Sequence, residues 1–258
     1  MRVLLTNDDG IGSDGLLALQ GLLTKNHDVR VVAPDKERSG TFHATTFREE
    51  IVVRSLGEGR YSCTGTPADC VLYSLLGAID FKPEVVISGI NLGANLGTDI
   101  VYSGTVGAAR QAVLMKVTGI AVSLVTMKSK PDFTVAARFI SDHLRFLTSL
   151  WDEEHFINVN VPDEASHKAG ISVTRPARRV YNFRIVEEGS EKNERAFTLH
   201  GTAGCVQDGD RTDWAAIRTG RISISPVSIH PANHAGTESC YAERVDAFSS
   251  GKNAVEFR

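Results

Sequence analysis

The stretch Val3-Leu4-Leu5-Thr6-Asn7-Asp8-Asp9-Gly10 opens the chain and decides how the rest is interpreted. Its first half is a short apolar run, which is typical of a buried strand. Its second half sets two carboxylates, Asp8 and Asp9, at the strand's end. Adjacent like charges raise each other's cost of ionising, and a bound cation is the usual relief. Carboxylate oxygens suit Mg²⁺ or Mn²⁺. The alternative is that one Asp caps the next helix while the other is solvated.

Four further apolar runs alternate with amphipathic stretches over the first 160 or so residues. The runs cover residues 29–33, 85–88, 120–124 and 156–161, and the amphipathic stretches lie near residues 14–25, 67–79, 104–117 and 132–149. This alternation is typical of a parallel sheet covered by helices on both faces. We therefore predict an α/β fold with a Rossmann-like, doubly wound, mostly parallel sheet, in which ligands bind at the carboxyl ends of the strands.

The pattern changes after about residue 165. Strand-like runs at residues 171–174, 180–185, 196–200 and 221–225 predict a β-rich extension, with a polar hairpin tip at Glu187–Asn193 and a helical tail near Tyr241–Phe248. We expect a single domain over residues 1–258, with a catalytic core at 1–165 and, at 166–258, a β-hairpin extension and a C-terminal arm. Such an arm often serves contacts between subunits, although an ordinary packed excursion explains it equally well.

Composition argues against several classes of protein. A formal net charge of −3 gives no support for stable nucleic-acid binding or for membrane-surface binding. No run of about 18 apolar residues predicts a membrane span. The chain starts directly on a strand pattern, so we expect no signal peptide. The four cysteines form no CxxC pair, and we expect reduced thiols in a cytoplasmic protein.

Three more loops carry polar side chains at predicted strand ends or helix starts. The loop after the second strand offers the hydroxyl of Ser39. The loop at 88–97 is rich in Gly and Asn, and Asn91 offers a neutral oxygen that suits a hard metal. Ser103-Gly104-Thr105 opens a helix and can hold phosphate with its N–H groups and hydroxyls. Each loop also has an explanation without a ligand. The loop with Ser39 would be a solvated loop, the loop at 88–97 a long turn, and Ser103-Gly104-Thr105 an ordinary helix cap.

Two alternatives come from other functional classes. Gly10-Ile11-Gly12-Ser13-Asp14-Gly15 spells GxGxxG, and Asp35 follows about 20 residues on, as in dinucleotide-binding proteins. An NAD(P)-dependent oxidoreductase is therefore one alternative, although Asp8 and Asp9 would repel a pyrophosphate. A catalytically silent nucleotide-binding protein is the other. A basic and aromatic stretch at 175–184 resembles single-strand binders, but we expect a solvated or subunit-facing strand.

Five blocks of the chain together resemble the survival protein E (SurE) family of metal-dependent nucleoside monophosphate phosphatases. In the family's order and spacing, they are Asn7–Ile11, Val32–Gly40, Gly65–Val71, Ser88–Gly97 and Tyr102–Val106. The resemblance covers the first 125 residues strongly. It continues more weakly through Asn158–Pro162, Val173–Arg175 and Thr212–Trp214.

The resemblance implies a Rossmann-like core, a projecting β-hairpin and a C-terminal segment exchanged between protomers of a homodimer or homotetramer. It implies one divalent cation per subunit, Mg²⁺ or Mn²⁺, held by Asp8, Asp9, Ser39 and Asn91. It places phosphate near Asn95, Ser103, Gly104 and Thr105. The implied activity is that of a 5'-nucleotidase on nucleoside 5'-monophosphates, with 3'-monophosphates and short polyphosphate left open as further substrates.

The expected mechanism is attack by a water molecule whose pKa the metal lowers, with Asp8 or Asp9 as general base. A covalent aspartyl-phosphate route is less favoured, because adjacent acids point to opposite faces of a regular strand. The chain departs from the family pattern at residues 12–15 and 41–44, and Phe42 and His43 would reshape the pocket mouth. His234 is a minor candidate to reach the pocket from the C-terminal part.

Overall fold

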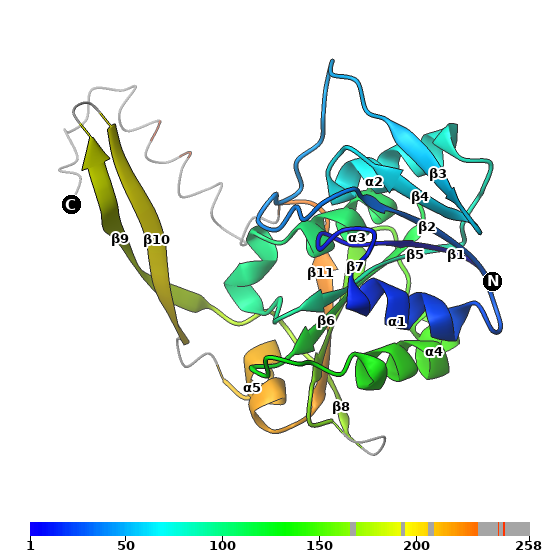
Figure 1. Cartoon of the computed structure of the whole chain (residues 1–258). Helices are drawn as coiled ribbons and strands as arrows, with labels where there is room; N and C mark the ends of the chain where they lie inside the picture. The colour runs from blue at the N-terminus through cyan, green and yellow to red at the C-terminus, as the bar shows by residue number, and fades with distance from the viewer. Residues whose placement is uncertain (166–168, 192–193, 206–208, 232–241, 243–244, 246–258) are drawn as a thin grey trace.

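The computed structural model describes residues 1–165, 169–191, 194–205, 209–231, 242 and 245. Its central sheet has nine strands, which are β1 (Arg2–Thr6), β2 (Asp28–Pro34), β3 (Val53–Gly57), β4 (Arg60–Cys63), β5 (Val85–Leu92), β6 (Thr118–Val125), β7 (His155–Pro162), β8 (Ile171–Val173) and β11 (Ile222–Ser228). A separate two-stranded sheet pairs β9 (Arg179–Glu191) with β10 (Glu194–Cys205). Figure 1 shows this pair projecting from the rest as a hairpin.

The strand order of the central sheet is β3-β4-β2-β1-β5-β6-β7-β11-β8. The six strands from β4 to β7 in this order are parallel to their neighbours. Only the pairs β3 with β4 and β7 with β11 are antiparallel within this sheet. The order reverses between β1 and β5, because the chain builds one side of the sheet and then returns to build the other. This is the predicted doubly wound topology, and ligands of such sheets bind at the reversal point.

Helices cover both faces of the sheet. They are α1 (Asp14–Leu23), α2 (Pro67–Tyr73), α3 (Gly104–Leu114), α4 (Thr134–Ser149) and α5 (Asp213–Arg218), with short helical turns η1 (Ser74–Ala78) and η2 (Gly97–Val101). Successive side chains of a strand point to opposite faces. In β1, Val3 and Leu5 therefore pack with α1 and α4, whereas Leu4 packs with α2 and α3.

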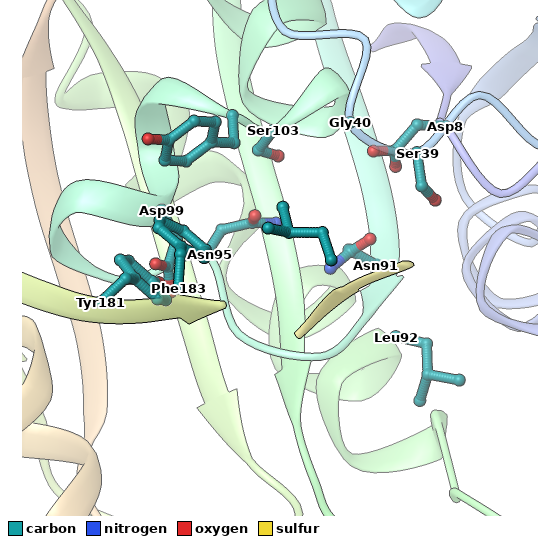
Figure 2. Close-up of a pocket in the computed structure, with 12 residues that line it drawn as sticks. Asp8, Ser39, Gly40, Asn91, Leu92, Asn95, Asp99, Ser103, Tyr181 and Phe183 are labelled. Carbon is teal, nitrogen blue, oxygen red and sulfur yellow. The ribbon is translucent and has the colours of Figure 1, made fainter. Parts of the chain in front are cut away.

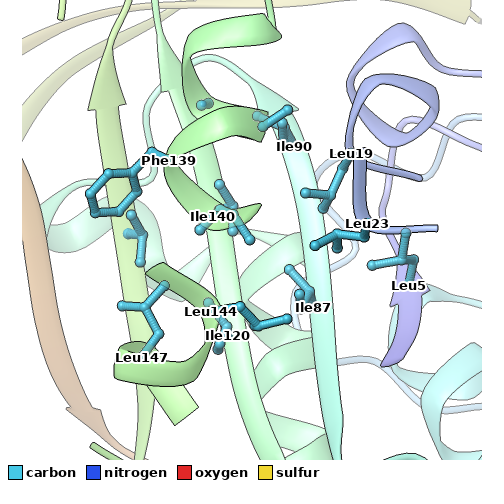
Figure 3. Close-up of a cluster of buried hydrophobic side chains, with 14 of the residues drawn as sticks. Leu5, Leu19, Leu23, Ile87, Ile90, Ile120, Phe139, Ile140, Leu144 and Leu147 are labelled. Carbon is cyan, nitrogen blue, oxygen red and sulfur yellow. The ribbon is translucent and has the colours of Figure 1, made fainter. Parts of the chain in front are cut away.

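The larger core cluster lies between α1, α4 and the sheet. Figure 3 shows Leu19 and Leu23 of α1 and Ile140 and Leu144 of α4 directed towards Ile87 of β5. All five side chains are buried. The other face is closed by smaller residues of α3, among them Ala108, Ala109 and Ala112, which let this helix approach the sheet closely.

Several elements differ from the sequence-based expectation. β3 and β4 were not predicted, because their sequences are too polar to form an apolar run, and pairing of β4 with β2 fixes them instead. α5 is too short to show a helical period. The predicted helix at 67–79 ends as α2 at Tyr73 and continues only as the turn η1. Both hairpin strands are longer than expected.

Some expectations concern residues outside the described part of the chain. This group contains most of the tail near Tyr241–Phe248, most of the C-terminal arm, residue His234 and two residues of the hairpin tip. Within the described part, no helix combines the length and the apolar character that a membrane crossing needs.

The core makes a direct prediction for α4. Leu144 is 1% exposed, and Leu144→Ala should lower the free energy of unfolding by about 2–5 kcal/mol, because it leaves a cavity in the larger cluster. Phe146 lies on the same helix but is 48% exposed, so Phe146→Ala is the matched control with a much smaller loss. Denaturant unfolding of both variants measures the difference. Equal losses of unfolding free energy in the two variants would contradict the packing of Leu144 in this core cluster.

Candidate active site

The polar loops predicted from the sequence meet at the reversal point of the sheet. Thr6 at the end of β1 pairs with Ser88 of β5, so Asp8 and Asp9 emerge beside the strand that carries Asn91. The loop after β2 is fastened to the same place, because the backbone N–H of Arg38 donates to the carbonyl oxygen of Asp8 at 2.7 Å. Pairing of β1 with both neighbours thus brings three loops together.

A cavity of about 470 Å³ opens at this edge of the sheet. Its volume lies within the range of about 300–1,000 Å³ that is usual for small-molecule sites. It is lined by Asp8, Ser39, Gly40, Asn91, Leu92, Asn95, Asp99, Tyr102, Ser103, Tyr181, Phe183 and Leu199. Figure 2 shows Asp8 and Ser39 at one end and Tyr181 and Phe183 at the other. The cavity therefore has a polar, acidic end and an aromatic end.

Asp8 is 4% exposed and lies at the N-terminus of α3. The hydroxyl of Thr105 donates to its Oδ1. Burial raises the pKa of the Asp8 carboxyl above its ordinary value, although hydrogen bonds from Thr105 and the backbone of Gly104 oppose the shift. A Cβ added to Gly104 would lie 3.0 Å from the Cβ of Asp8, so glycine permits this close approach.

Asp9 is half-buried and has no compensating cation among the described residues. Burial and the charge of Asp8 raise the pKa of Asp9 to about 6, and Glu37 adds to the shift. Neither Asp8 nor Asp9 forms an ion pair with a lysine, arginine or histidine of the described chain. Two crowded carboxylates in this state are what a divalent cation would stabilise.

Ser39 and Asn91 supply neutral oxygens beside the acids. The Ser39 hydroxyl donates to Glu37 Oε1 at 3.0 Å, which leaves the lone pairs of its oxygen free to accept. The Asn91 Nδ2 donates to the carbonyl oxygen of Gly93 at 3.0 Å, and Figure 2 shows the amide oxygen towards Asp8 and Ser39. All four expected ligands are hard oxygen donors, so the donor set fits Mg²⁺ or Mn²⁺.

In the described residues, no group of three or more His, Cys, Asp and Glu side chains could hold a metal. A cation at the acidic end would therefore depend on the serine and asparagine as well as on the two carboxylates. Sequence reasoning could find this set because each member follows a predicted strand.

The four expected phosphate-binding residues separate into two pairs. Asn95 and Ser103 line the cavity, whereas Gly104 and Thr105 lie behind Asp8 and contact it. The Ser103 oxygen accepts the N–H of Val106 at 3.2 Å and so caps α3. Its own O–H proton remains able to donate into the cavity.

Two residues that the site hypothesis did not include hold Asn95 in place. Asn158 and Asn160 on β7 both donate their side-chain amides to the carbonyl oxygen of Asn95, at 2.9 and 3.0 Å. The N–H of Asn95 donates to Asn160 Oδ1 at 3.0 Å, and its Nδ2 donates to Ser123 Oγ at 2.8 Å. Two fully buried asparagines at i and i+2 of an apolar strand are a signal that sequence reasoning could have used.

The aromatic end of the cavity comes from the hairpin and was not expected at the site. Tyr181 and Phe183 belong to the basic and aromatic stretch that we expected to be solvated or subunit-facing, and both line the cavity, where Phe183 remains 54% exposed. An ion pair of Arg179 with Asp99 fastens the hairpin to the site, and Thr98 Oγ1 donates to the carbonyl oxygen of Arg179 at 3.1 Å. A local sequence pattern could not predict this contact, because Arg179 and Asp99 are 80 positions apart in the chain.

The pocket-mouth departures also have definite positions. Phe42 meets Tyr102, a residue of the cavity wall, edge to face at 5.3 Å between ring centroids. The His43 ring hydrogen-bonds Gln111 Oε1 at 2.8 Å. Phe42 therefore packs against the cavity wall, His43 is held by a residue of α3, and the effect of both on the pocket mouth stays a prediction.

The GxGxxG stretch is held by its own loop. Asn7 Nδ2 donates to the carbonyl oxygen of Gly10 at 3.0 Å and to Ser13 Oγ at 2.6 Å. A Cβ on Gly15 would lie 2.1 Å from the carbonyl oxygen of Ile90, so this glycine allows α1 to pack closely against β5. Loop closure and packing thus account for Gly10 and Gly15 without a pyrophosphate.

Comparisons with known proteins agree in pointing to one family. A family model described as "Survival protein SurE" matches residues 3–183. The 5'-nucleotidase SurE of Nitrosomonas europaea is 40% identical over 232 residues, covering 89% of this chain and 93% of that protein. The 5'-nucleotidase SurE of Pelobacter propionicus is 38% identical over 237 residues, covering 91% and 96%. The crystal structure of the SurE protein from Aquifex aeolicus has a TM-score of 0.81 and 32% identity, covering 94% of this chain and 100% of that one.

The raised pKa of Asp9 predicts a pH-dependent stability of the metal-free protein. Its pKa is about 6 in the folded state against an ordinary 3.8, so the folded state holds a proton that the unfolded chain releases. The free energy of unfolding should therefore contain a contribution that falls as pH rises through this window. Asp9→Asn removes that contribution, and the variant should gain stability relative to wild type as pH rises.

Thermal unfolding in EDTA from about pH 4 to about pH 7 measures this difference. At about pH 7, added Mn²⁺ should reduce the stability difference between Asp9→Asn and wild type, because the cation would stabilise the ionised carboxylate pair of the wild-type protein. A difference in melting temperature between the two proteins that stays constant across the pH range would contradict the raised pKa of Asp9.

Proposed function

Because this chain belongs to the SurE family, we propose that it is a metal-dependent 5'-nucleotidase, which hydrolyses nucleoside 5'-monophosphates to nucleoside and phosphate. The observation that carries the proposal is the uncompensated pair Asp8 and Asp9 beside Ser39 and Asn91, at the reversal point of a doubly wound sheet. The cavity beside it has the size and the two-ended character that a nucleotide requires. 3'-Monophosphates and short polyphosphate remain further candidates.

We propose that one Mg²⁺ or Mn²⁺ ion per subunit is held by Asp8, Asp9, Ser39 and Asn91. The support is the hard oxygen character of all four and the lack of a described cationic partner for the acids. When bound, the cation would polarise a phosphoryl oxygen and lower the pKa of the attacking water.

The chain's own groups would then position the substrate and move a proton. Asp8 lines the cavity and Asp9 adjoins it, and one of them would take the proton of the attacking water. The Ser103 O–H and the clamped Asn95 amide would donate to phosphoryl oxygens as negative charge builds there. The N-terminus of α3 adds a favourable dipole for that charge.

The two alternatives have less support. The loop that contains GxGxxG is closed by Asn7 and carries two carboxylates, which disfavours a dinucleotide pyrophosphate. A silent binding protein would not need the buried acidic pair, whose ionisation costs free energy. The relatives reported above bear the name 5'-nucleotidase, not that of an oxidoreductase.

We also propose that residues 1–258 form one SurE-like domain, with a core at 1–165 and an oligomerisation extension at 166–258, that assembles as a homodimer or homotetramer. The support is the hairpin, since an isolated two-stranded sheet is marginally stable in water. Ile185 is 66% exposed and Phe197 is also exposed. The buried free thiols of Cys63 and Cys70 are consistent with a cytoplasmic location.

Phosphate release tests the activity. Wild-type protein should release phosphate from nucleoside 5'-monophosphates with Mg²⁺ or Mn²⁺ and none with EDTA. Asp8→Asn and Asp9→Asn should each lower the rate by at least about a hundredfold, because each loses a ligand and a candidate base. Ser39→Ala should mainly raise the Mn²⁺ concentration that gives half the full rate.

Folding of the Asn variants is checked by circular dichroism, so that a lost rate is not a lost fold. Full activity of either variant would contradict the mechanism, and so would undiminished activity of wild type in EDTA. If no Mn²⁺ concentration restored any of the rate lost in Ser39→Ala, Ser39 would not be a ligand.

Self-association through the hairpin makes a separate prediction. Ile185→Asn should shift the mass measured by light scattering towards the monomer, because it places a polar group in an apolar contact. Arg184→Gln, next to it on the opposite side of β9, is the control and should leave the mass unchanged. A wild-type protein that is monomeric at micromolar concentration would contradict the assembly.

A further inference from the structure

A long loop joins β2 to β3 and carries the proposed metal ligand Ser39. Before Ser39 the loop is fixed by Arg38, whose backbone N–H donates to Asp8 and whose Nη2 donates to the carbonyl oxygen of Thr64 at 2.6 Å. After Ser39, the hydroxyl of Thr41 closes a turn by donating to the carbonyl oxygen of Arg38 at 2.8 Å. Ser39 therefore lies in a closed turn, and the position of that turn also depends on what holds the loop beyond it.

Farther along, the same loop is tied to the side chain of Asp69, in the first turn of α2. Asp69 Oδ1 accepts the backbone N–H of Thr46 at 2.9 Å, and Asp69 Oδ2 accepts the Thr46 hydroxyl at 2.8 Å. The same Oδ2 accepts the N–H of Thr66 at 2.9 Å, and the Thr66 hydroxyl donates to the carbonyl oxygen of Ala44 at 2.6 Å. These contacts join residues 44–46 of the loop to the N-terminal cap of α2.

Capping of the helix alone does not account for these contacts. The capping box of α2 needs only the bonds between Thr66 and Asp69, whereas both bonds from Thr46 hold the loop. Asp69 is 0% exposed, and a buried carboxylate needs such hydrogen bonds or a charged partner. A Cβ added to Gly65 would lie 2.7 Å from the Cβ of Asp69, so glycine permits this close packing. The Asp69 carboxylate therefore fastens the loop as well as capping α2.

We propose that Asp69 is a positioning residue for the metal site and acts through the loop that carries Ser39. The inference rests on the metal-dependent activity proposed above and assigns a role to a residue that does not line the cavity. Groups that orient metal ligands without binding the metal contribute about ten- to a hundredfold to metal affinity. Asp69 holds the loop and not the Ser39 side chain itself, so the loss on its replacement lies at the lower end of this range.

Calorimetric titration of the metal-free protein with Mn²⁺ tests this role without reference to turnover. In Asp69→Asn, an amide nitrogen replaces one oxygen and meets the N–H of Thr46 or that of Thr66, so a bond is lost whichever way the amide is turned. The Kd for Mn²⁺ should rise by about tenfold. The value of kcat at saturating Mn²⁺ should change much less, because all four proposed ligands are still present.

A second variant separates the loop from the helix cap. Thr46→Val removes the hydroxyl bond to Asp69 and leaves the bonds between Thr66 and Asp69 in place, so the Kd for Mn²⁺ should rise by about threefold. Thr45→Val is the matched control, because the Thr45 hydroxyl forms no hydrogen bond with the residues that the structure describes. Its Kd should equal that of wild type.

A double-mutant cycle with Ser39 identifies the route by which Asp69 acts. In the Ser39→Ala background, Asp69→Asn should raise the Kd for Mn²⁺ no further, because the ligand that the loop positions is already absent. Melting temperatures of all variants are measured in parallel. A purely structural role of Asp69 would lower the melting temperature and leave the Kd of the folded protein unchanged.

The outcomes separate the positioning role from the proposed activity. An unchanged Kd in Asp69→Asn and Thr46→Val, or an equal effect of Asp69→Asn with and without Ser39, would overturn the positioning role and leave the metal site intact. If Asp69→Asn does not fold, Thr46→Val compared with Thr45→Val decides the matter. Mn²⁺ binding that depends on Asp69, in a protein that releases no phosphate, would support the positioning role and overturn the phosphatase. A wild-type protein that binds no Mn²⁺ would overturn both.

Discussion

The burial of the Asp8 and Asp9 carboxylates at the end of β1, with the charge of Asp8 adding to the cost of ionising Asp9, is the constraint on which the site depends. Burial makes both ionised forms costly, and it raises both pKa values in the metal-free protein. The N-terminus of α3 and the Thr105 hydroxyl stabilise Asp8 in part. In the proposed metal site, a cation shared with the oxygens of Ser39 and Asn91 would supply the rest of the stabilisation of the ionised acids.

The doubly wound sheet makes this arrangement possible because β1 is central to it. Its two parallel neighbours bring the loops after β2 and β5 to the same edge. The hairpin is joined to that edge by Asp213, which accepts the N–H of Gly97 at 2.7 Å and that of Ala177 at 2.9 Å. A Cβ on Gly97 would lie 2.1 Å from the carbonyl oxygen of Ala177, so only glycine allows the contact. The acidic and aromatic ends of the cavity are thereby held in one structure.

Much of this could be predicted from the sequence, because local pattern and strand order carry it. The apolar run before Asp8 marks a buried strand, and its position at a strand's carboxyl end follows from the fold class. Asn91 and Ser39 could be found by the same rule. The pairing of β4 with β2 could not, because Arg60–Cys63 has no apolar run and only tertiary contact fixes it.

Two features of the site were hidden for a different physical reason. Thr105 is predicted at the phosphate because it opens a helix, and no local pattern reveals that its hydroxyl also donates to Asp8. The stretch with Tyr181 and Phe183 was predicted to be a solvated or subunit-facing strand, because alternation along β9 indicates which residues share a face and not that this face borders the cavity. Their role depends on the Arg179 and Asp99 ion pair, which joins segments 80 residues apart.

The most direct measurement is anomalous X-ray scattering from crystals of the protein soaked in Mn²⁺, because it locates the cation without reference to activity. The account predicts one strong manganese peak per subunit, with oxygens of Asp8, Asp9, Ser39 and Asn91 around it, and its loss in crystals of Asp9→Asn. A peak at another place in the chain, or a peak at this place that persists without the Asp9 carboxylate, would contradict it.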